Sequence, residues 1–336
     1  MTELATNYMG LELRNPLLAS PSPQSYSFDG LQRLAASGVG AIVLYSLFEE
    51  QIREQQARIA ELVDGPAESF AEALDYIPAI AKEDPGPRGY LALLERAAAS
   101  IDVPVIGSLN GITPEGWTGY AHDMQEAGAA GIELNIYYLP GDPEMAGREV
   151  EQRHVEVLER VKETVSIPVA VKLSPYFSSL GEIATSLDDA GADALVLFNR
   201  FLQPDVDPEQ LMVLPRVTLS SPTDGRLPRA WIALLRGQVR ASLAGTSGVE
   251  VPADVARYLL AGADVVMTTS ALLRHGQAYA GELLDGLTRW MRRKGFESVD
   301  QFRGLLAVPT TADRDEYERA GYVSAMRAAN AGAYVP

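Results

Sequence analysis

The stretch GIELNIYYLPGDPEMAGREVEQRHVEVLERVKETVSIPVAVKLSP, at residues 131–175, decides the fold. It begins with a short apolar run, Gly131–Ile136, and ends with a second one, Pro168–Ser174. Between them, Val150–Val165 has the apolar spacing of an amphipathic helix. Short, nearly continuous apolar runs are typical of strands that are buried on both faces of a parallel sheet. The stretch therefore predicts a strand, a helix and a second strand parallel to the first.

The same alternation extends along the chain in both directions. The predicted strands are Asn15–Ser20, Gly40–Ser46, Val103–Leu109, Gly131–Ile136, Pro168–Ser174, Ala194–Asn199, Val239–Gly245 and Val265–Ser270. The predicted helices are Phe28–Ser37, Pro114–Ala127, Val150–Val165, Ser179–Ala190, Pro252–Ala261 and Ala271–Arg293. A glycine, the residue that commonly ends a helix in the left-handed conformation, stands before four of the strands: Gly38, Gly128, Gly191 and Gly262.

Eight strands that alternate with helical segments predict an α/β protein with a single (β/α)8 TIM barrel. A doubly wound sheet is the alternative, but no G-x-G-x-x-G motif opens any of the helices, which favours the barrel. Thr6–Leu13 predicts a hairpin on the barrel floor. Long loops, Leu47–Arg88 and Arg200–Pro228, follow the second and sixth strands on the face where barrel active sites lie. We expect the barrel to occupy residues 1–311, with a C-terminal tail or helix at residues 312–336.

Composition excludes several classes of function. The chain has 336 residues, no cysteine and a formal net charge of −17. The negative charge opposes binding to nucleic acid or to an anionic membrane. Without cysteine the chain offers no disulfide, thiolate nucleophile or cysteine-ligated cluster. No stretch is long and apolar enough to span a bilayer, and the first ten residues do not resemble a signal peptide, so we expect a cytoplasmic protein.

Polar side chains at strand ends are the first candidates for chemistry. Lys172 alternates with apolar residues in its strand, and burial of an unpaired ammonium is costly. Asn135 lies on the same face of its strand as Glu133, and Asn199 ends the sixth strand. We expect these groups to converge on the mouth of the barrel. The alternative is a structural ion pair between Lys172 and Glu133.

Two turns rich in small residues follow the last two strands. They are Gly245-Thr246-Ser247-Gly248 and Thr268-Thr269-Ser270. Small residues let backbone N–H groups approach an anion, and the loops after strands seven and eight are the usual phosphate site of this fold. Together the turns predict a phosphate-binding site, whereas each alone is also compatible with a tight turn.

These segments resemble the dihydroorotate dehydrogenase family, in its dihydroorotate dehydrogenase-like branch. The matching pieces are Asn15–Ser20, Glu133–Asn135, Val171–Phe177, Asn199, Gly245–Val249 and Ala261–Ala263. The resemblance implies the cofactor FMN, an oxidoreductase acting on a CH–CH bond, and a place in pyrimidine biosynthesis. It assigns the flavin ring and ribityl chain to Lys172, Asn135 and Asn199, the phosphate to Gly245, Ser247, Gly248, Thr269 and Ser270, and the flavin border to Ala19 and Ser20. An ammonium beside the ring stabilises the negative charge of reduced flavin.

The substrate half departs from the family pattern. Tyr138 stands where the family has its cysteine or serine base, and Tyr45 replaces the lysine of a Lys-Ser pair after the second strand. Ala67–Ala81 occupies the region of the asparagine-rich orotate-binding stretch. A phenol is a poor base at neutral pH but can donate a proton. We therefore predict that the protein reduces an activated alkene more readily than it oxidises dihydroorotate, with Tyr138, or its neighbour Tyr137, as the catalytic proton donor.

Other expectations concern the substrate and partners. Arg200 opens a long loop at a strand end and is expected, with Tyr45, to bind a small-molecule substrate, for which a carboxylate suits the guanidinium. A homodimer and a separate electron-transfer partner are compatible with the sequence. Two alternative functions remain: a Schiff-base aldolase that uses Lys172, and a non-catalytic barrel that binds a phosphate ligand.

The histidines give no sign of a metal site. His122, His154 and His275 fall in helical patterns, and we expect all of them on solvated helix faces. No metal is therefore predicted.

Overall fold

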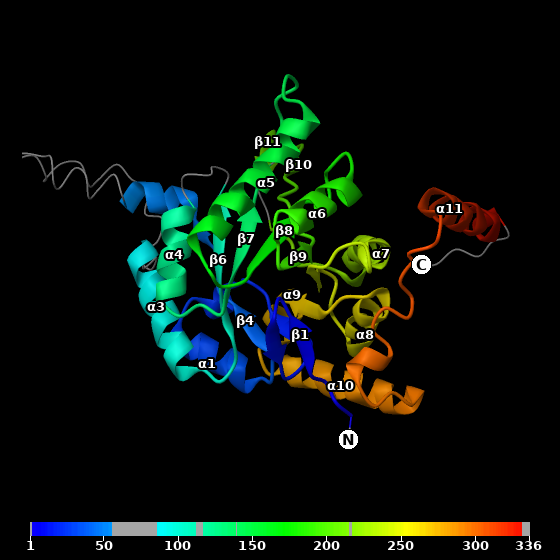
Figure 1. Cartoon of the computed structure of the whole chain (residues 1–336), viewed down its shortest axis with the longest axis horizontal. Helices are drawn as coiled ribbons and strands as arrows, with labels where there is room; N and C mark the ends of the chain where they lie inside the picture. The colour runs from blue at the N-terminus through cyan, green and yellow to red at the C-terminus, as the bar shows by residue number, and fades with distance from the viewer. Residues whose placement is uncertain (1, 56–85, 112–116, 139, 215–216, 331–336) are drawn as a thin grey trace, which may run out of the picture.

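Eight parallel strands close into a barrel in the computed structural model, which describes residues 2–55, 86–111, 117–138, 140–214 and 217–330 (Figure 1). The barrel strands are β3 (Leu17–Ala19), β4 (Ala41–Val43), β6 (Val105–Gly111), β7 (Gly131–Ile136), β8 (Val169–Leu173), β9 (Ala194–Leu197), β12 (Ser242–Thr246) and β13 (Val265–Thr268). Each pairs in parallel with its neighbours, and the β13–β3 and β4–β6 pairings close the ring. The predicted TIM barrel is confirmed.

Side chains alternate between the barrel interior and the helices. The interior holds one apolar cluster that includes Leu18, Val43, Ala170, Val196 and Met267. The residues between them along each strand face outward and join the larger core under the helices. This alternation follows from the two-residue period of a strand. Polar residues at positions whose side chains point inward, such as those in β7 and β8, therefore lie inside the barrel.

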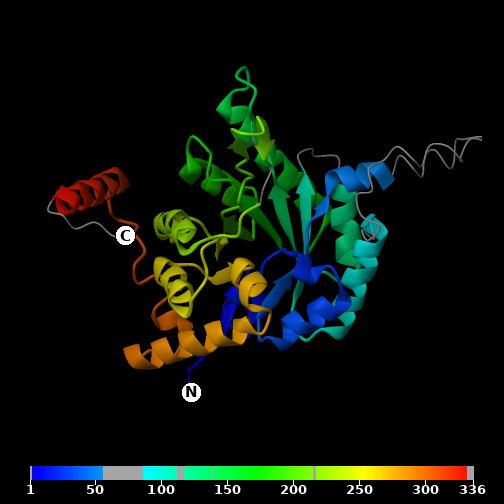
Figure 2. The same ribbon diagram turned by 180° about the vertical axis from the view of Figure 1, so that it is seen from behind.

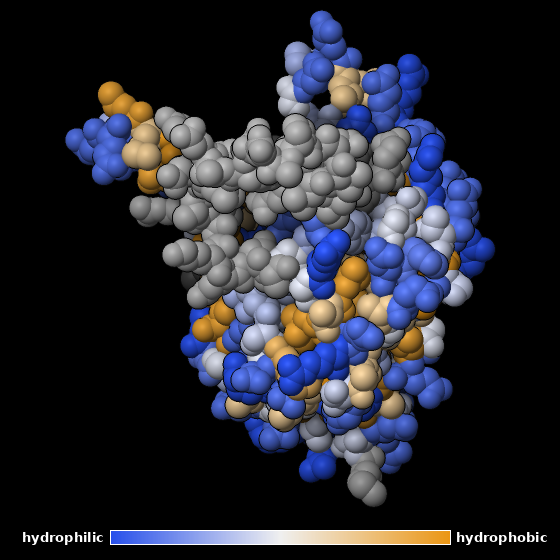
Figure 3. All heavy atoms as spheres, turned by 90° about the vertical axis from the view of Figure 1, so that its left-hand side faces the viewer, coloured by the Kyte–Doolittle hydropathy of each residue, from blue (hydrophilic) through white to orange (hydrophobic). Residues whose placement is uncertain are grey.

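Helices surround the barrel (Figure 1). They are α1 (Phe28–Ala36), α3 (Gly86–Ser100), α4 (Thr118–Glu126), α5 (Gly147–Thr164), α6 (Leu180–Asp189), α7 (Arg226–Leu235), α8 (Pro252–Ala261), α9 (Ser270–His275) and α10 (Tyr279–Lys294). The glycines expected to end helices all have positive φ, namely 97° at Gly38, 86° at Gly128, 91° at Gly191 and 118° at Gly262. Over the face formed by α1, α3 and α4, hydrophilic and hydrophobic residues mix in small patches (Figure 3).

Two helical features differ from the expectation, and one could not be compared with it. The helices α3 and α7 were not predicted. Ala271–Arg293 is two helices rather than one, because Gly276, with φ 84°, interrupts the helical backbone between α9 and α10. The predicted start of Pro114–Ala127 lies outside the described residues.

The predicted N-terminal hairpin is present as β1 (Thr6–Tyr8) and β2 (Leu11–Leu13). Tyr8, Met9 and Leu13 are buried in the apolar cluster of the barrel interior. The hairpin therefore covers the floor of the barrel, at the end opposite to the C-terminal ends of the strands (Figure 2).

The loops after β4 and β9 carry further short elements. The first contains β5 (Leu47–Phe48), which pairs with β6, and its residues 56–85, including Ala67–Ala81, lie outside the described residues. The second contains the hairpin β10 (Asp205–Asp207) and β11 (Met212–Leu214), then the short 3-10 helix η4 (Pro222–Gly225). In the part of the chain that the structure describes, the other 3-10 helices are η1 (Pro23–Ser25) and η5 (Val299–Gln301).

The C-terminal helix α11 (Arg314–Asn330) projects away from the barrel (Figures 1 and 2). Its tyrosines Tyr317 and Tyr322 are exposed. None of the helices in the described ranges has the length and apolar character needed to cross a membrane.

His154 is not on a solvated face, which corrects the expectation for this residue. It lies on the inner face of α5, is 1% exposed, and packs edge-on against Phe177 with a ring-centroid distance of 5.0 Å. Its Nδ1 lies 2.8 Å from the carbonyl oxygen of Val150. His122 and His275 are exposed as expected.

The buried imidazole of His154 is expected to make stability depend on pH. Burial lowers the pKa of His154 below its ordinary value. The unfolded chain therefore gains a proton near pH 6.5 that the folded chain does not, and stability falls by up to about 1.4 kcal/mol per pH unit below that pH. In urea titrations between pH 5 and pH 7, His154→Gln should reduce this slope and the exposed-residue control His122→Gln should retain it. Equal slopes of stability against pH in the two variants would contradict the assignment of this pH dependence to His154.

Candidate functional site at the mouth of the barrel

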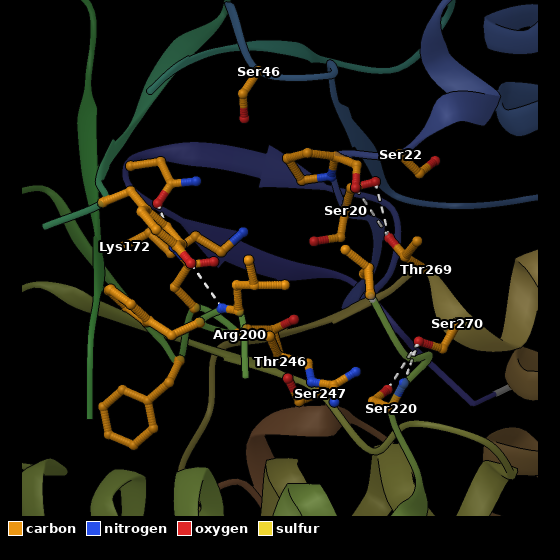
Figure 4. Close-up of a pocket in the computed structure, with 18 of the residues that line it drawn as sticks. Ser20, Ser22, Ser46, Lys172, Arg200, Ser220, Thr246, Ser247, Thr269 and Ser270 are labelled. Carbon is orange, nitrogen blue, oxygen red and sulfur yellow. Dashed lines mark hydrogen bonds between the residues drawn. The ribbon is translucent and has the colours of Figure 1, made fainter. Parts of the chain in front are cut away.

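A cavity of about 1180 Å³ opens at the C-terminal ends of the barrel strands (Figure 4). Its walls come from β6 and β8, and from the ends of β3, β4, β7, β9, β12 and β13 with the segments that follow them. Ligand pockets commonly measure about 300–1,000 Å³, so this cavity has room for a cofactor together with a small substrate. Its position is the one that active sites occupy in barrels of this kind.

Several polar side chains from the adjacent strands β7 and β8 and from the end of β9 lie together at the base of the cavity. The Nζ of Lys172 is 3.2 Å from Oε1 of Glu133, and the two residues are only 8% and 1% exposed. Asn199 donates a hydrogen bond of 2.6 Å from Nδ2 to Oδ1 of Asn135. Lys172, Asn135 and Asn199 all line the cavity. Lys172 therefore fits both interpretations from the sequence. It forms an ion pair with Glu133 inside the barrel, and it also lines the cavity at the barrel mouth.

Hydroxyl groups form another part of the cavity wall. The contributing residues that Figure 4 labels are Ser20, Ser22, Ser46, Ser220, Thr246, Ser247, Thr269 and Ser270. The Oγ of Ser270 accepts hydrogen bonds from the backbone N and the Oγ of Ser220, at 2.9 and 3.0 Å. Thr269 donates from Oγ1 to the carbonyl of Ser20 at 3.1 Å. Hydroxyls and backbone N–H groups gathered in this way suit a phosphate.

Ser220 was not predicted. It reaches the cavity from the long loop after β9, and its Oγ accepts a hydrogen bond from the N–H of Gly248 at 3.2 Å. The only signal in the sequence is a pair of small hydroxyl residues, Ser220-Ser221, inside an insertion. Such a pair is common in loops and does not identify a binding residue.

Gly245 within β12, Gly248 in the turn after it, and Ala19 lie behind the cavity wall. A Cβ on Gly245 would lie 2.2 Å from the ring of Tyr258, and a Cβ on Gly248 would lie 2.4 Å from the backbone N of Gly225. Ala19 is 2% exposed within the barrel wall. These residues let the turn pack closely, and the neighbours Ser247 and Ser20 form the surface of the cavity.

Gly248→Val is expected to weaken FMN retention while the barrel stays folded. Gly248 has φ 66°, so a branched side chain is strained there and collides with the backbone of Gly225. The turn should shift enough to weaken FMN binding about tenfold, which is roughly 1.4 kcal/mol. FMN content after dialysis and circular dichroism measure the two effects. Gly119→Ala, in α4, is the control because a Cβ there meets no atom within 4 Å. Equal FMN content in the two variants would contradict the placement of the FMN phosphate at the turn after β12.

Tyr137, not Tyr138, reaches the cavity. Tyr137 lines it, stacks on Phe201 with a centroid distance of 4.4 Å, and accepts a hydrogen bond of 2.7 Å from the N–H of Leu202 at its hydroxyl. The hydroxyl of Tyr138 donates instead to the sulfur of Met145 at 3.0 Å. This geometry does not support the role predicted for Tyr138 and favours the alternative, Tyr137.

Of the two residues expected to bind the substrate, Arg200 lines the cavity and Tyr45 does not. Tyr45 is 4% exposed, packs against Tyr26 and Tyr90, and does not line the cavity, so its predicted contact with substrate is not supported. Its neighbour Ser46 does line it. Arg200 also lines the cavity, and its Nη1 donates to the carbonyl of Thr218 at 2.5 Å (Figure 4).

The fold and the cavity define a class of protein, a TIM barrel with hydroxyl-bearing turns after the last two strands and a lysine at the mouth. Comparison with known proteins gives the family. The dihydroorotate dehydrogenase family model matches residues 3–291. The chain therefore belongs to the dihydroorotate dehydrogenase family, whose members are flavin oxidoreductases with FMN as cofactor.

Individual relatives cover almost the same length. The dihydroorotate dehydrogenase B (NAD(+)) catalytic subunit of Methanothermobacter thermautotrophicus is 27% identical over 311 residues, which are 90% of this chain and 98% of the relative. The subunit of the same name from Thermococcus kodakarensis is 27% identical over 312 residues, 91% of this chain and 98% of the relative. A putative dihydroorotate dehydrogenase A (fumarate) of Solibacter usitatus is 24% identical over 319 residues, with coverage of 90% and 98%.

The described residues fit FMN. The hydroxyls and backbone of the turns after β12 and β13 are suited to a phosphate, and Ser220 adds a further hydroxyl. Lys172 and the amides of Asn135 and Asn199 supply a cation and hydrogen-bonding groups at the base of the same cavity. Both requirements of a flavin mononucleotide, an anionic end and a polar ring edge, are thus met within one cavity.

Proposed function

We propose that this protein is an FMN-dependent oxidoreductase that acts on the CH–CH bond of a small carboxylate, and that it reduces an activated alkene more readily than it oxidises dihydroorotate. The observation that carries the proposal is Tyr137 on the cavity wall after β7. Its hydroxyl oxygen accepts a hydrogen bond from Leu202, so its own proton is available to another acceptor. A phenol in this place gives a proton more readily than it takes one.

The side chains divide the chemistry between them. FMN, when bound, supplies hydride transfer at its ring. Lys172 would lie beside the ring, where its ammonium favours negative charge, while Glu133 below it holds the ammonium in position. Arg200, fixed by the carbonyl of Thr218, would bind the substrate carboxylate. Tyr137 would donate the proton that completes reduction of the double bond.

In the proposed direction, reduction of an alkene, electrons would enter the flavin from a second protein. The relatives from Methanothermobacter thermautotrophicus and Thermococcus kodakarensis are named as catalytic subunits. This chain has no cysteine to ligate an iron–sulfur cluster of its own. A separate electron-transfer partner is therefore part of the proposal.

The ion pair at Lys172 argues against a Schiff-base aldolase. Imine formation requires a neutral amine, whereas the Glu133 carboxylate 3.2 Å away stabilises the ammonium. The absorption spectrum of the purified protein separates the two functions. We expect a yellow protein that releases FMN on denaturation and forms no covalent adduct with a carbonyl compound and borohydride. A colourless protein that is trapped by borohydride would overturn the proposal.

A further inference from the structure

A second cavity, of about 270 Å³, lies on the outside of the barrel. Its walls are Pro222 and Thr223 of η4, Arg226 and Arg229 of α7, and Arg257 of α8. The helices α7 and α8 are neighbours in the ring around the barrel (Figure 1). None of these residues lines the cavity at the barrel mouth, so the two cavities are separate.

Three arginines around one small cavity are unusual in a chain with a net charge of −17. Arg257 is paired with the buried carboxylate of Asp254, at 2.6 Å. Within the described residues, Arg226 and Arg229 have no carboxylate partner. Two cations at the cavity therefore have no carboxylate within 4.0 Å in the described part of the chain, although the more distant Asp254 acts on Arg229.

Arg229 carries the strongest indication of a missing ligand. Its Nη1 atom is buried and finds no hydrogen-bond acceptor within the described ranges. Burial lowers the pKa of Arg229, and the opposing effects of Tyr258 and Asp254 do not offset it. A buried donor without an acceptor costs free energy. Because other atoms of the Arg229 side chain line the cavity, a rotation of the guanidinium toward a ligand oxygen there would satisfy this donor.

We propose that the cavity between α7 and α8 binds a phosphate group, either as inorganic phosphate or as the phosphate of a small metabolite. The planar guanidinium matches phosphate oxygens with paired hydrogen bonds. Thr223 adds a hydroxyl at the same cavity. The proposal goes beyond the redox function, because it concerns a separate site on the outer surface of the barrel.

Tyr258 separates this site from the main cavity. The guanidinium of Arg229 lies over its ring, 5.5 Å from the centroid. The hydroxyl of Tyr258 hydrogen-bonds to the carbonyls of Thr246 and Ser247, at 2.8 and 2.7 Å. The proposed site therefore lies behind the turn assigned to the FMN phosphate, and an experiment must distinguish binding at the two places.

The test is isothermal titration of the FMN-loaded protein with inorganic phosphate and with ribose 5-phosphate, at an ionic strength held constant with chloride. We expect at least one probe to bind while FMN stays on the protein, as measured by visible absorbance of the filtrate. The double variant Arg226→Gln/Arg229→Gln should bind it at least about tenfold more weakly, since charge-assisted hydrogen bonds are lost. Arg160→Gln, an exposed arginine on α5, should bind as the unmodified protein does. The probe that binds more tightly identifies free phosphate or a phosphate ester as the source.

Three results would overturn the proposal. They are no binding of either probe at millimolar concentration, equal binding by the double variant and the unmodified protein, and binding that releases FMN in proportion. Circular dichroism establishes whether the double variant is folded. If it is not, the single variant Arg226→Gln, at an exposed position, serves in its place and is expected to weaken binding in the same direction.

Discussion

Lys172→Met is expected to lower the free energy of unfolding by about 3–5 kcal/mol, because it leaves a buried carboxylate without its partner. Glu133 is 1% exposed, and Lys172 is the cation that contacts it. Within the described part of the chain its second oxygen, Oε2, is buried without a hydrogen-bond donor, so the carboxylate depends on this ion pair. Urea denaturation measures the loss.

The double variant Lys172→Met/Glu133→Gln should recover most of this stability, since the uncompensated charge is removed with the lysine. It should not recover the rate of flavin reduction, because the ammonium beside the ring is still absent. Lys162→Met is the matched control: its partner Asp193 is 2.7 Å away but partly exposed, and such pairs contribute about 0–1 kcal/mol. A loss no larger for Lys172→Met than for Lys162→Met would contradict the role of the buried pair.

Tyr137→Phe is expected to slow reoxidation of the reduced flavin by an unsaturated carboxylic acid by about 10²-fold, the usual contribution of a general acid. The substitution removes only the hydroxyl and keeps the ring that stacks on Phe201. Reduction of the flavin by an artificial donor should be unchanged, because that step needs no proton from the tyrosine. Stopped-flow absorbance of the two half-reactions measures both rates.

Tyr138→Phe provides the matched control on the adjacent residue. Its hydroxyl contacts Met145 and its ring lies under Arg153, 4.5 Å from the guanidinium carbon, away from the cavity. This variant should reoxidise at the unmodified rate. If Tyr138→Phe were slow and Tyr137→Phe fast, the proton donor would be the residue that the structure places outside the cavity.

Strand periodicity was sufficient to predict the base of the site. Side chains in a strand point alternately to its two faces. Glu133 and Asn135 occupy inward-facing positions of β7, and Lys172 occupies an inward-facing position of β8. The same rule, continued beyond the end of β7 at Ile136, points Tyr137 inward. Tyr138 was favoured by its match to the family's base position, which fixes a place along the chain but not the direction of a side chain.

Other parts of the structure had no such signal, or had one that was misread. Helix α7 begins within the loop after β9, and Pro228 suggested the end of that loop, although proline is tolerated in the first turn of a helix. His154 shares a face of α5 with the buried residues Val150, Val157 and Val161, so its helical spacing did indicate burial. Ser220 reaches the cavity only through the course of a long loop, which residue spacing does not determine.

The most direct test of the proposed function compares two half-reactions of the same protein. In one, the reduced flavin is mixed without oxygen with an activated unsaturated acid, fumarate or cinnamate; in the other, the oxidised flavin is mixed with dihydroorotate. The proposal predicts that at least one of the two acids reoxidises the flavin faster than dihydroorotate reduces it. Faster reduction by dihydroorotate than reoxidation by either acid would contradict it.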